Sequence, residues 1–149
     1  MDLGAAIERF RTESKDLSRV VKDLRAEVAG YRAAALRDTA ETSRVGRGVL
    51  RHEPGWDASA LKSLALAIVA EPGFVVVLAG DGQPAPVVVA RSADRDFDSG
   101  RWMQGAAAAL GGRGGGRPEL AQGGLASDPA SVLEYARTTI LDGGVGREG

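Results

Sequence analysis

The sequence predicts an α/β protein in which a long N-terminal coiled-coil helix is followed by a small globular domain with a mixed sheet. Two observations predict this fold class. Residues 1–41 carry apolar side chains at heptad spacing, whereas residues 42–149 alternate short β-branched runs with amphipathic helical stretches. We therefore expect two parts, a helical coiled-coil stalk over residues 1–41 and an α/β globular domain over residues 42–149.

The stalk has apolar residues at alternating spacings of four and three, the a/d pattern of a coiled coil, over about five heptads. Ser14 interrupts the pattern once, and Gly30 costs about 1 kcal/mol relative to alanine, which permits a bend there. The chain has no second heptad segment, so we expect this seam to pair with another copy or with another part of a longer parent. The alternative is one long helix docked on its own globular domain. The residues predicted to form the dimerisation seam are Leu3, Ile7, Phe10, Leu17, Val21, Leu24, Val28 and Tyr31.

Three further helices are predicted from their apolar faces and their N-terminal signals. They cover residues 58–70, residues 99–110 and residues 129–141. Short polar side chains precede each of them and satisfy the free N–H groups of the first turn. The expected N-caps are Asp57 or Ser59 for the first helix, Asp98 or Ser99 for the second, and Asp128, followed by Pro129, for the third.

The strands of the globular domain are predicted from β-branched runs. Residues 74–79 and 87–90 are continuous runs of this kind, typical of strands buried on both faces, and their short connection predicts an antiparallel hairpin. Residues 42–52 contain a weaker strand pattern. The last residues, 142–149, are glycine-rich and are expected to form a frayed end.

The composition limits the possible functions. Lysine and arginine number 19 against 20 aspartates and glutamates, which gives a net charge of −1. Proteins that bind nucleic acid through non-specific phosphate contacts are usually basic, because counterion release drives that binding. A nucleic-acid role therefore requires a local basic patch. The chain contains no cysteine, which excludes disulfides, thiolate zinc sites and cysteine nucleophiles.

Targeting signals are also missing from the sequence. No apolar run approaches the roughly 18 residues of a membrane-spanning helix. The first residues include acids and lack the cationic region of a secretory signal. We therefore expect a cytoplasmic protein without a membrane partner.

Several isolated polar and aromatic residues favour structural roles over chemistry. His52 is the single histidine and has no nucleophile motif nearby. The alternating carboxylates of residues 94–98 suit a solvated loop with one helix cap better than a cation site. Trp56 and Trp102 have the rings to stack on nucleobases, but packing in the core or at its edge is the better interpretation.

The most informative stretch is the glycine-rich segment of residues 111–124. Glycine fills every position from 111 to 116 except Arg113, and such a run suggests positive φ angles or close approach of the backbone to a ligand. We interpret the segment as a loop whose backbone N–H groups form an anion-binding nest, with Arg113 and Arg117 as phosphate donors. The alternative is a flexible linker. The order of elements differs from both the Walker loop and the dinucleotide fingerprint, since here a helix ends at Gly111.

The run from Gly111 to Gly124, GGRGGGRPELAQGG, resembles the signature of the DHH-associated domain at the C-terminus of alanyl-tRNA synthetases. The upstream residues 91–94 and 97–100 look more like the stand-alone alanyl-tRNA editing proteins that carry the same domain. The resemblance covers residues 42–141 and implies a module that dimerises and binds tRNA, in particular tRNA-Ala. The residues that it assigns to nucleic-acid binding are Arg113, Arg117, Gly112, Gly114, Gly115 and Gly116.

The same resemblance bears on catalysis. Family members remove mischarged amino acids with a zinc site of several His and Cys residues in a separate domain, which this chain has too few of those residues to build. We therefore expect a non-catalytic chain without a cofactor, either a part of a larger editing protein or synthetase or a natural stand-alone domain. Two alternatives remain open, a purely structural dimerisation domain and an accessory domain of the phosphoesterase type. The glycine motif of phosphoesterases typically includes a histidine, which is missing here.

Overall fold

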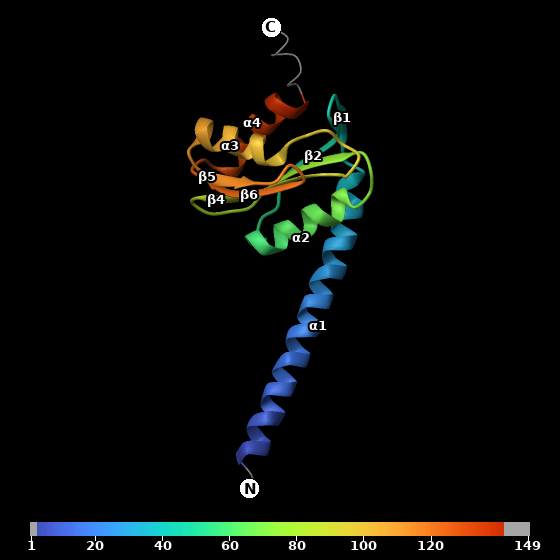
Figure 1. Ribbon diagram of the computed structural model, residues 1–149, viewed down its shortest axis with the longest axis vertical. Helices are drawn as coiled ribbons and strands as arrows, with labels where there is room; N and C mark the ends of the chain where they lie inside the picture. Colours follow the sequence, from blue (N-terminus) through green and yellow to red (C-terminus); the bar gives the residue numbers. More distant parts are fainter. Residues whose placement is uncertain (1–2, 142–149) are drawn as a thin grey trace.

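The computed structural model describes residues 3–141, so the predicted frayed end over residues 142–149 lies outside the described residues. A single helix, α1 (Leu3–Arg37), is 35 residues long and projects from a compact lobe (Figure 1). It runs without interruption through Gly30. The predicted long N-terminal helix is therefore confirmed.

The lobe contains a six-stranded mixed sheet with helices on both faces, which confirms the predicted α/β fold class. The strand order is β1-β2-β3-β4-β6-β5, and only the β2–β3 pair is parallel. The elements of the lobe are β1 (Glu41–Ser43), β2 (Gly46–His52), α2 (Ala58–Val69), β3 (Phe74–Ala79), β4 (Ala85–Arg91), α3 (Ser99–Leu110), β5 (Gly112–Gly116), β6 (Leu120–Leu125), α4 (Pro129–Ala136) and a π-helical turn (Arg137–Leu141).

Two apolar layers hold the helices on the sheet. On one face, α2 packs its buried leucines and Ile68 against Val76 and Val88 of the central strands. On the other face, α3 and α4 pack Met103 and Val132 against residues such as Val89. Every residue of β3 is buried, as the continuous apolar run predicted. Most core side chains are valine, leucine or alanine, so the sheet is covered mainly by aliphatic groups.

The stalk docks on the lobe through a narrow stripe of its last turns, Ala29, Ala33 and Leu36, which packs against α2. This stripe is rotated by about 120° around α1 from the predicted heptad seam, because each residue turns the helix by about 100°. All eight seam residues are exposed, with values between 38% and 79%. The helix therefore does dock on its own domain, but with a different face, and the seam remains uncovered.

The N-caps follow the sequence prediction. Asp57, Asp98 and Asp128 each accept a hydrogen bond from a backbone N–H in the first turn of α2, α3 and α4. The predicted final helix is shorter than expected, because regular α-helix ends at Ala136 and a π-helical turn continues to Leu141. None of the helices within residues 3–141 combines the length and apolar character that crossing a membrane requires.

Two regions of the lobe differ from the prediction. Residues 41–52 form a two-stranded hairpin, β1–β2, where the pattern predicted one weak strand. The glycine-rich segment, predicted as a loop, forms the antiparallel pair β5–β6 instead. Glycine has a low strand propensity, so the local sequence does not indicate these two strands. The neighbouring strand β4 and the helix α3 hold them in place.

Candidate nucleic-acid interface

The β5–β6 hairpin forms one end of the sheet, with β5 as the edge strand (Figure 1). Helix α3 covers one face of the hairpin. On the opposite face, α2 lies over β3 and β4 and stops short of the hairpin. One face of β5 and β6 is therefore open, and because side chains alternate along a strand, it presents Arg113, Gly115, Gln122 and Gly124.

Most glycines of the hairpin serve internal packing. A Cβ on Gly114 would lie 2.5 Å from Cγ of Met103 on α3, and a Cβ on Gly123 would lie 2.6 Å from the Arg113 carbonyl oxygen. Gly112 has a φ of 113°, which side-chain-bearing residues rarely adopt. The expected positive φ angles are found at Gly112 and at Gly116 (φ 159°), and Gly114 and Gly123 let α3 and the two strands lie close together.

Gly115 is different. A Cβ on Gly115 would meet no atom within 4 Å, and its φ is not in the left-handed region. Neither packing nor backbone conformation therefore explains the missing side chain. Gly115 lies directly opposite Gln122 on β6 and shares the open face with Arg113.

A shallow depression of about 550 Å³ adjoins this open face. Its lining residues come from the start of β5, the end of β6 and the turn before β4, and are Gln83, Pro84, Gly112, Arg113, Gly124 and Ala126. Because two glycines line it, the peptide backbone itself forms part of the surface. The Arg113 side chain is exposed at its border. We call the open face of Arg113, Gly115, Gln122 and Gly124, together with this depression, the glycine face.

The turn of the hairpin places Arg117 at the other end of β5. Arg117 and Leu120 exchange backbone hydrogen bonds across the turn, and Pro118 occupies the position that favours proline in such turns. The Arg117 guanidinium lies 3.3 Å from the Glu119 carboxylate, so an acidic neighbour partly neutralises it. The two arginines therefore flank the same strand but differ in electrostatic surroundings.

The predicted anion-binding nest is wrong in its geometry. The segment is an extended strand paired with β6, so its successive N–H groups alternate in direction and cannot converge on one anion. The N-terminus of α3 is also occupied, because the N–H groups of Ser99 and Gly100 donate to the carbonyl oxygens of Pro118 and Arg117. Of the predicted phosphate donors, the exposed guanidinium groups of Arg113 and Arg117 are the ones that keep a suitable position.

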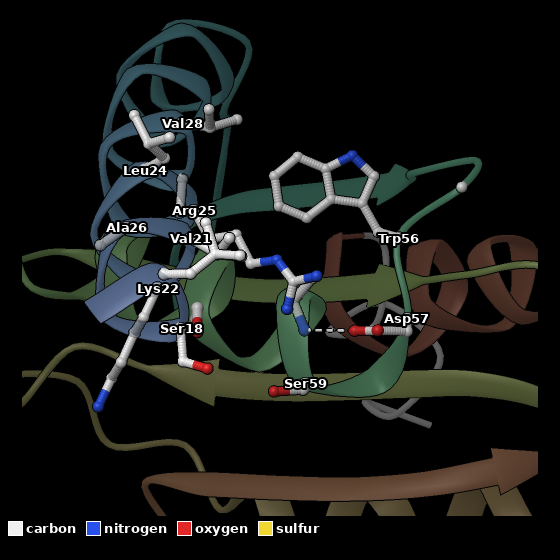
Figure 2. Close-up of a pocket in the computed structure, with 15 residues that line it drawn as sticks. Ser18, Val21, Lys22, Leu24, Arg25, Ala26, Val28, Trp56, Asp57 and Ser59 are labelled. Carbon is white, nitrogen blue, oxygen red and sulfur yellow. Dashed lines mark hydrogen bonds between the residues drawn. The ribbon is translucent and has the colours of Figure 1, made fainter. Parts of the chain in front are cut away.

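A second open surface lies between α1 and the segment before α2. It is a groove of about 950 Å³, and Figure 2 shows the Trp56 indole facing the side of α1 that carries Val21, Leu24 and Val28. Trp56 is half-buried and packs against the core beneath α2. We call this surface the Trp56 groove. Trp102, in contrast, is 9% exposed and donates from Nε1 to Thr139, which confirms its predicted core position.

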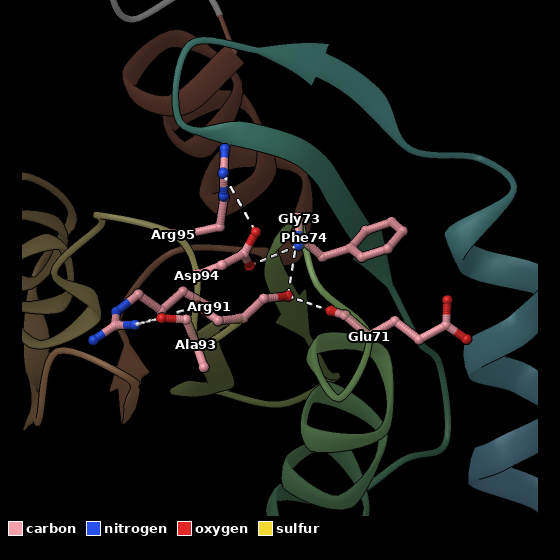
Figure 3. A network of polar contacts seen from close by, with 8 residues as sticks. Glu71, Gly73, Phe74, Arg91, Ala93, Asp94 and Arg95 are labelled. Carbon is pink, nitrogen blue, oxygen red and sulfur yellow. Dashed lines mark hydrogen bonds and ion pairs between the residues drawn. The ribbon is translucent and has the colours of Figure 1, made fainter.

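The remaining polar clusters have structural partners. Ser92 joins the α2–β3 turn to the loop before α3, since its hydroxyl donates to the Glu71 carbonyl and accepts from the Phe74 N–H (Figure 3). Asp94 accepts from the Gly73 N–H at 2.8 Å, and this hydrogen bond is the main reason why its pKa is lowered. Asp94 thus acts as a loop acceptor and Asp98 as a helix cap, which agrees with the predicted structural roles.

His52 lies at the exposed end of β2, with Nε2 2.7 Å from the Asp81 carboxylate. This hydrogen bond, followed by one from the Gly55 N–H, lowers the pKa of Asp81. Among residues 3–141, no group of three or more His, Asp or Glu side chains is placed to hold a metal ion.

The structure brings together only part of the predicted site. Arg113 and Gly115 share the glycine face, whereas Gly112, Gly114 and Gly116 are constrained by packing within the hairpin. Arg117 lies at the turn. Sequence analysis missed Gln122 and Gly124, because their contribution appears only when β6 is paired with β5. The alternation of the GGRGGG and AQGG segments around a Pro–Glu turn is the signal that could have revealed the hairpin.

Comparisons with known proteins agree with this architecture. Residues 38–142 match the family model described as the DHHA1 domain. The chain is similar to an alanine–tRNA ligase of Trichodesmium erythraeum, with 31% identity over 150 residues. That match covers 95% of this chain but 17% of the ligase, so the chain spans about a sixth of the relative's length.

Two solved structures share the fold. The C-Ala domain from Aquifex aeolicus alanyl-tRNA synthetase superposes with a TM-score of 0.58 at 22% identity, covering 66% of this chain and 94% of that domain. RecJ from Thermus thermophilus, solved in complex with Mg²⁺, superposes with a TM-score of 0.56 at 20% identity, covering 82% of this chain and 19% of RecJ. At these identities the likeness concerns the fold alone.

Proposed function

The chain belongs to the DHHA1 domain family, and on that premise we propose that it is a non-catalytic module that binds tRNA through the glycine face and dimerises through α1. The similarity to an alanine–tRNA ligase makes tRNA-Ala the first RNA to test. We also propose that the module has two parts, the stalk of residues 1–41 and the lobe of residues 42–149.

The observation that carries the RNA proposal is Gly115. It is a glycine of β5 with no packing or conformational reason to lack a side chain, and it lies in the middle of an open surface. A strand without side chains lets a ribose or a base approach the peptide planes closely. Arg113 on the same face supplies a charged, bidentate donor for a phosphate oxygen. Gln122, directly opposite Gly115, adds amide donors and an acceptor.

The net charge of −1 sets the expected strength of this interaction. A small local patch with one or two arginines replaces few counterions, so the binding should depend only weakly on salt. A module of this kind would bind RNA weakly by itself. Its main effect would be to raise the affinity of a catalytic partner or parent protein for tRNA. Placing two lobes on one dimer would increase that contribution through effective concentration.

The dimerisation proposal rests on the seam of α1. Its eight residues are exposed although the helix is already docked on the lobe, and a run of exposed leucine, isoleucine and valine on a projecting helix is unfavourable in water. A second candidate function follows from the same observation. The chain would then be a purely structural dimerisation domain, and the glycine face would have no RNA partner.

One titration separates these two functions. The affinity of the chain for tRNA-Ala and for an unrelated tRNA is measured by fluorescence anisotropy at two salt concentrations. We expect binding that weakens as salt rises, with a shallow slope. Absence of binding at low salt, for a chain that sediments as a dimer, would leave the structural role as the function.

A further inference from the structure

The order of residue types along the heptad seam indicates the number and the relative orientation of the helices that pair. With Leu17 and Leu24 at d positions, Val21 and Val28 fall at a positions. Ile7 is also at a and Leu3 is also at d, so three of the five a positions are β-branched and three of the five d positions are leucine; the others are Ser14 and Ala35 at a, and Phe10 and Tyr31 at d. β-Branched residues at a with leucine at d favour two helices in parallel orientation over trimers and tetramers.

The charged residues beside the seam point to the same orientation. The e positions carry arginine at 11, 25 and 32, and the g positions carry glutamate at 13 and 27. In a parallel pair, g residues of one helix face e residues of the other, so Glu27 meets Arg32 of the second copy. In an antiparallel pair, e faces e and g faces g, which would bring arginine to arginine and glutamate to glutamate.

The lobe leaves room for this pairing. Tyr31 and Ala35, at the end of the seam nearest the lobe, are both exposed, so the uncovered face continues along the docked part of α1. The docking stripe of Ala29, Ala33 and Leu36 lies about 120° away around the helix. A second helix on the seam would therefore not compete with the docking stripe.

The Trp56 groove includes the middle of the seam. Its wall on α1 contains the seam residues Leu17, Val21, Leu24 and Val28 together with Ser18 and Arg25 at e positions, and its opposite wall includes Trp56. In a parallel pair, the g residue that faces Arg25 is Val20 of the second copy. Val20 is 51% exposed in the single chain, and an aliphatic side chain there suits the apolar indole.

We infer that two copies of this chain associate through α1 as a parallel, in-register coiled coil, in which the second helix also borders the Trp56 groove. This inference rests on the dimerisation proposed above and adds its orientation. The Arg32 guanidinium uses Nε and Nη2 for Glu53, and its remaining donors are available to Glu27 of the second copy. The paired helices would hold both glycine faces at the same end of the dimer.

Disulfide exchange tests the orientation directly, because the natural chain contains no cysteine. Two variants, Phe10→Cys at a d position and Val28→Cys at an a position, each carry one thiol, and one of them has an extra tag to change its mass. The two are mixed in reduced form and equilibrated in a glutathione buffer. A parallel pair gives disulfides between identical variants. An antiparallel pair centred between Leu17 and Val21 brings position 10 opposite position 28 and gives the mixed disulfide.

The outcomes separate the inference from the proposal beneath it. Disulfides between identical variants support the parallel pair. A dimer in sedimentation that gives mixed disulfides, or none, overturns the parallel arrangement while dimerisation stands. A monomer in sedimentation overturns dimerisation itself and the inference with it.

A charge reversal gives a second, independent readout. Glu27→Lys places lysine at g against Arg32 of the second copy, and we expect the dissociation constant of the dimer to rise about three- to tenfold, since two such contacts are lost per dimer. Asp23→Lys makes the same change in net charge at the outward-facing c position and should leave the constant within about twofold. An unchanged or tighter dimer for Glu27→Lys would contradict the parallel arrangement, because that variant relieves glutamate repulsion in an antiparallel pair.

Discussion

Arg32 of the stalk donates two parallel hydrogen bonds, each 2.8 Å long, to the carboxylate of Glu53 in the lobe. Glu53 is 2% exposed, so its charge is removed from water and depends on this partner. The same hydrogen bonds raise the pKa of Arg32. Together with the small residues Ala29 and Ala33, this ion pair fixes the direction in which the stalk leaves the lobe.

Removal of Arg32 should therefore destabilise the docking of α1 on the lobe. Arg32→Ala leaves the Glu53 carboxylate buried and unpaired, and we expect the free energy of unfolding to fall by about 1–3 kcal/mol. Arg19→Ala, on the exposed part of α1, is the matched control and should change it by less than about 0.5 kcal/mol. Urea denaturation of both variants makes the comparison. Equal stability of the two would show that the ion pair contributes nothing to docking.

Two neighbouring glycines should respond in opposite ways to valine. Gly114→Val forces a side chain against Met103 and is expected to cost about 1–3 kcal/mol through overpacking. Gly115→Val enters open space in a strand, where valine is favourable, so thermal stability should stay the same or rise. We expect Gly115→Val nevertheless to weaken tRNA binding at least about fivefold, roughly 1 kcal/mol, by covering the glycine face.

The contradicting result for this pair is specific. If Gly115→Val binds tRNA as the natural chain does, in the same anisotropy assay, the glycine face is not the RNA contact. Loss of stability in Gly115→Val would instead show that the position has a packing role that the open surroundings do not reveal.

The salt dependence of RNA binding should report the two arginines separately. Replacement of both Arg113 and Arg117 by alanine is expected to reduce the slope of log K against log salt concentration by roughly 2, and Arg113→Ala alone by about 1. Glu119→Gln frees Arg117 from its ion pair and should strengthen binding. Arg51→Ala, on β2, serves as control, and a slope unchanged in the double variant would remove the hairpin from the interface.

The sequence predicted those features that are encoded locally. The caps Asp57, Asp98 and Asp128 and the apolar run of β3 each depend on residues close in the chain, and the structure has them where the pattern places them. The strand β5 could not be found in this way. Its glycines have low strand propensity, and its extended conformation depends on β6 and on α3 packed behind it.

The candidate site shows the same division. Arg113 stands out in the sequence because charge and glycine neighbours are visible without a fold. The distinction between Gly114 and Gly115 is not visible, since only the position of Met103 on α3 separates them. The face of α1 that docks on the lobe could not be predicted for a similar reason. In the sequence, Ala29 and Ala33 look like ordinary surface alanines of a helix.

Acid should destabilise the lobe through its hydrogen-bonded carboxylates. The pKa of Asp94 is lowered chiefly by the Gly73 N–H, and that of Asp128 by hydrogen bonds from Ser131. A folded-state pKa below the unfolded value means that the stabilisation is present above about pH 4 and is lost as pH falls through the folded pKa. We expect the melting temperature to be flat above about pH 5 and to drop below about pH 4, less steeply in Asp94→Asn. A variant curve parallel to that of the natural chain would exclude this contribution.

Two buried serines provide the sharpest test of the polar interior. Ser92 is 1% exposed and bridges two backbone groups, the Glu71 carbonyl and the Phe74 N–H, at the turn that leads into β3 (Figure 3). Ser99 is 0% exposed, and its hydroxyl has no hydrogen-bond partner. Ser92→Ala leaves two backbone groups without their hydrogen-bond partner and should lower the free energy of unfolding by about 1–3 kcal/mol. Ser99→Ala removes an unsatisfied hydroxyl and should leave the free energy of unfolding unchanged or raise it.

The two substitutions delete the same atom from sites of similar burial, so any difference in unfolding free energy comes from the hydrogen bonds alone. Urea denaturation at neutral pH measures it. A loss of more than about 1 kcal/mol in Ser99→Ala would mean that its hydroxyl has a partner, and the close packing of the α3 N-terminus against the Arg117–Pro118 turn would then need a polar link. Because that turn ends β5, such a link would also connect α3 to the glycine face, and Ser99→Ala would weaken tRNA binding together with stability.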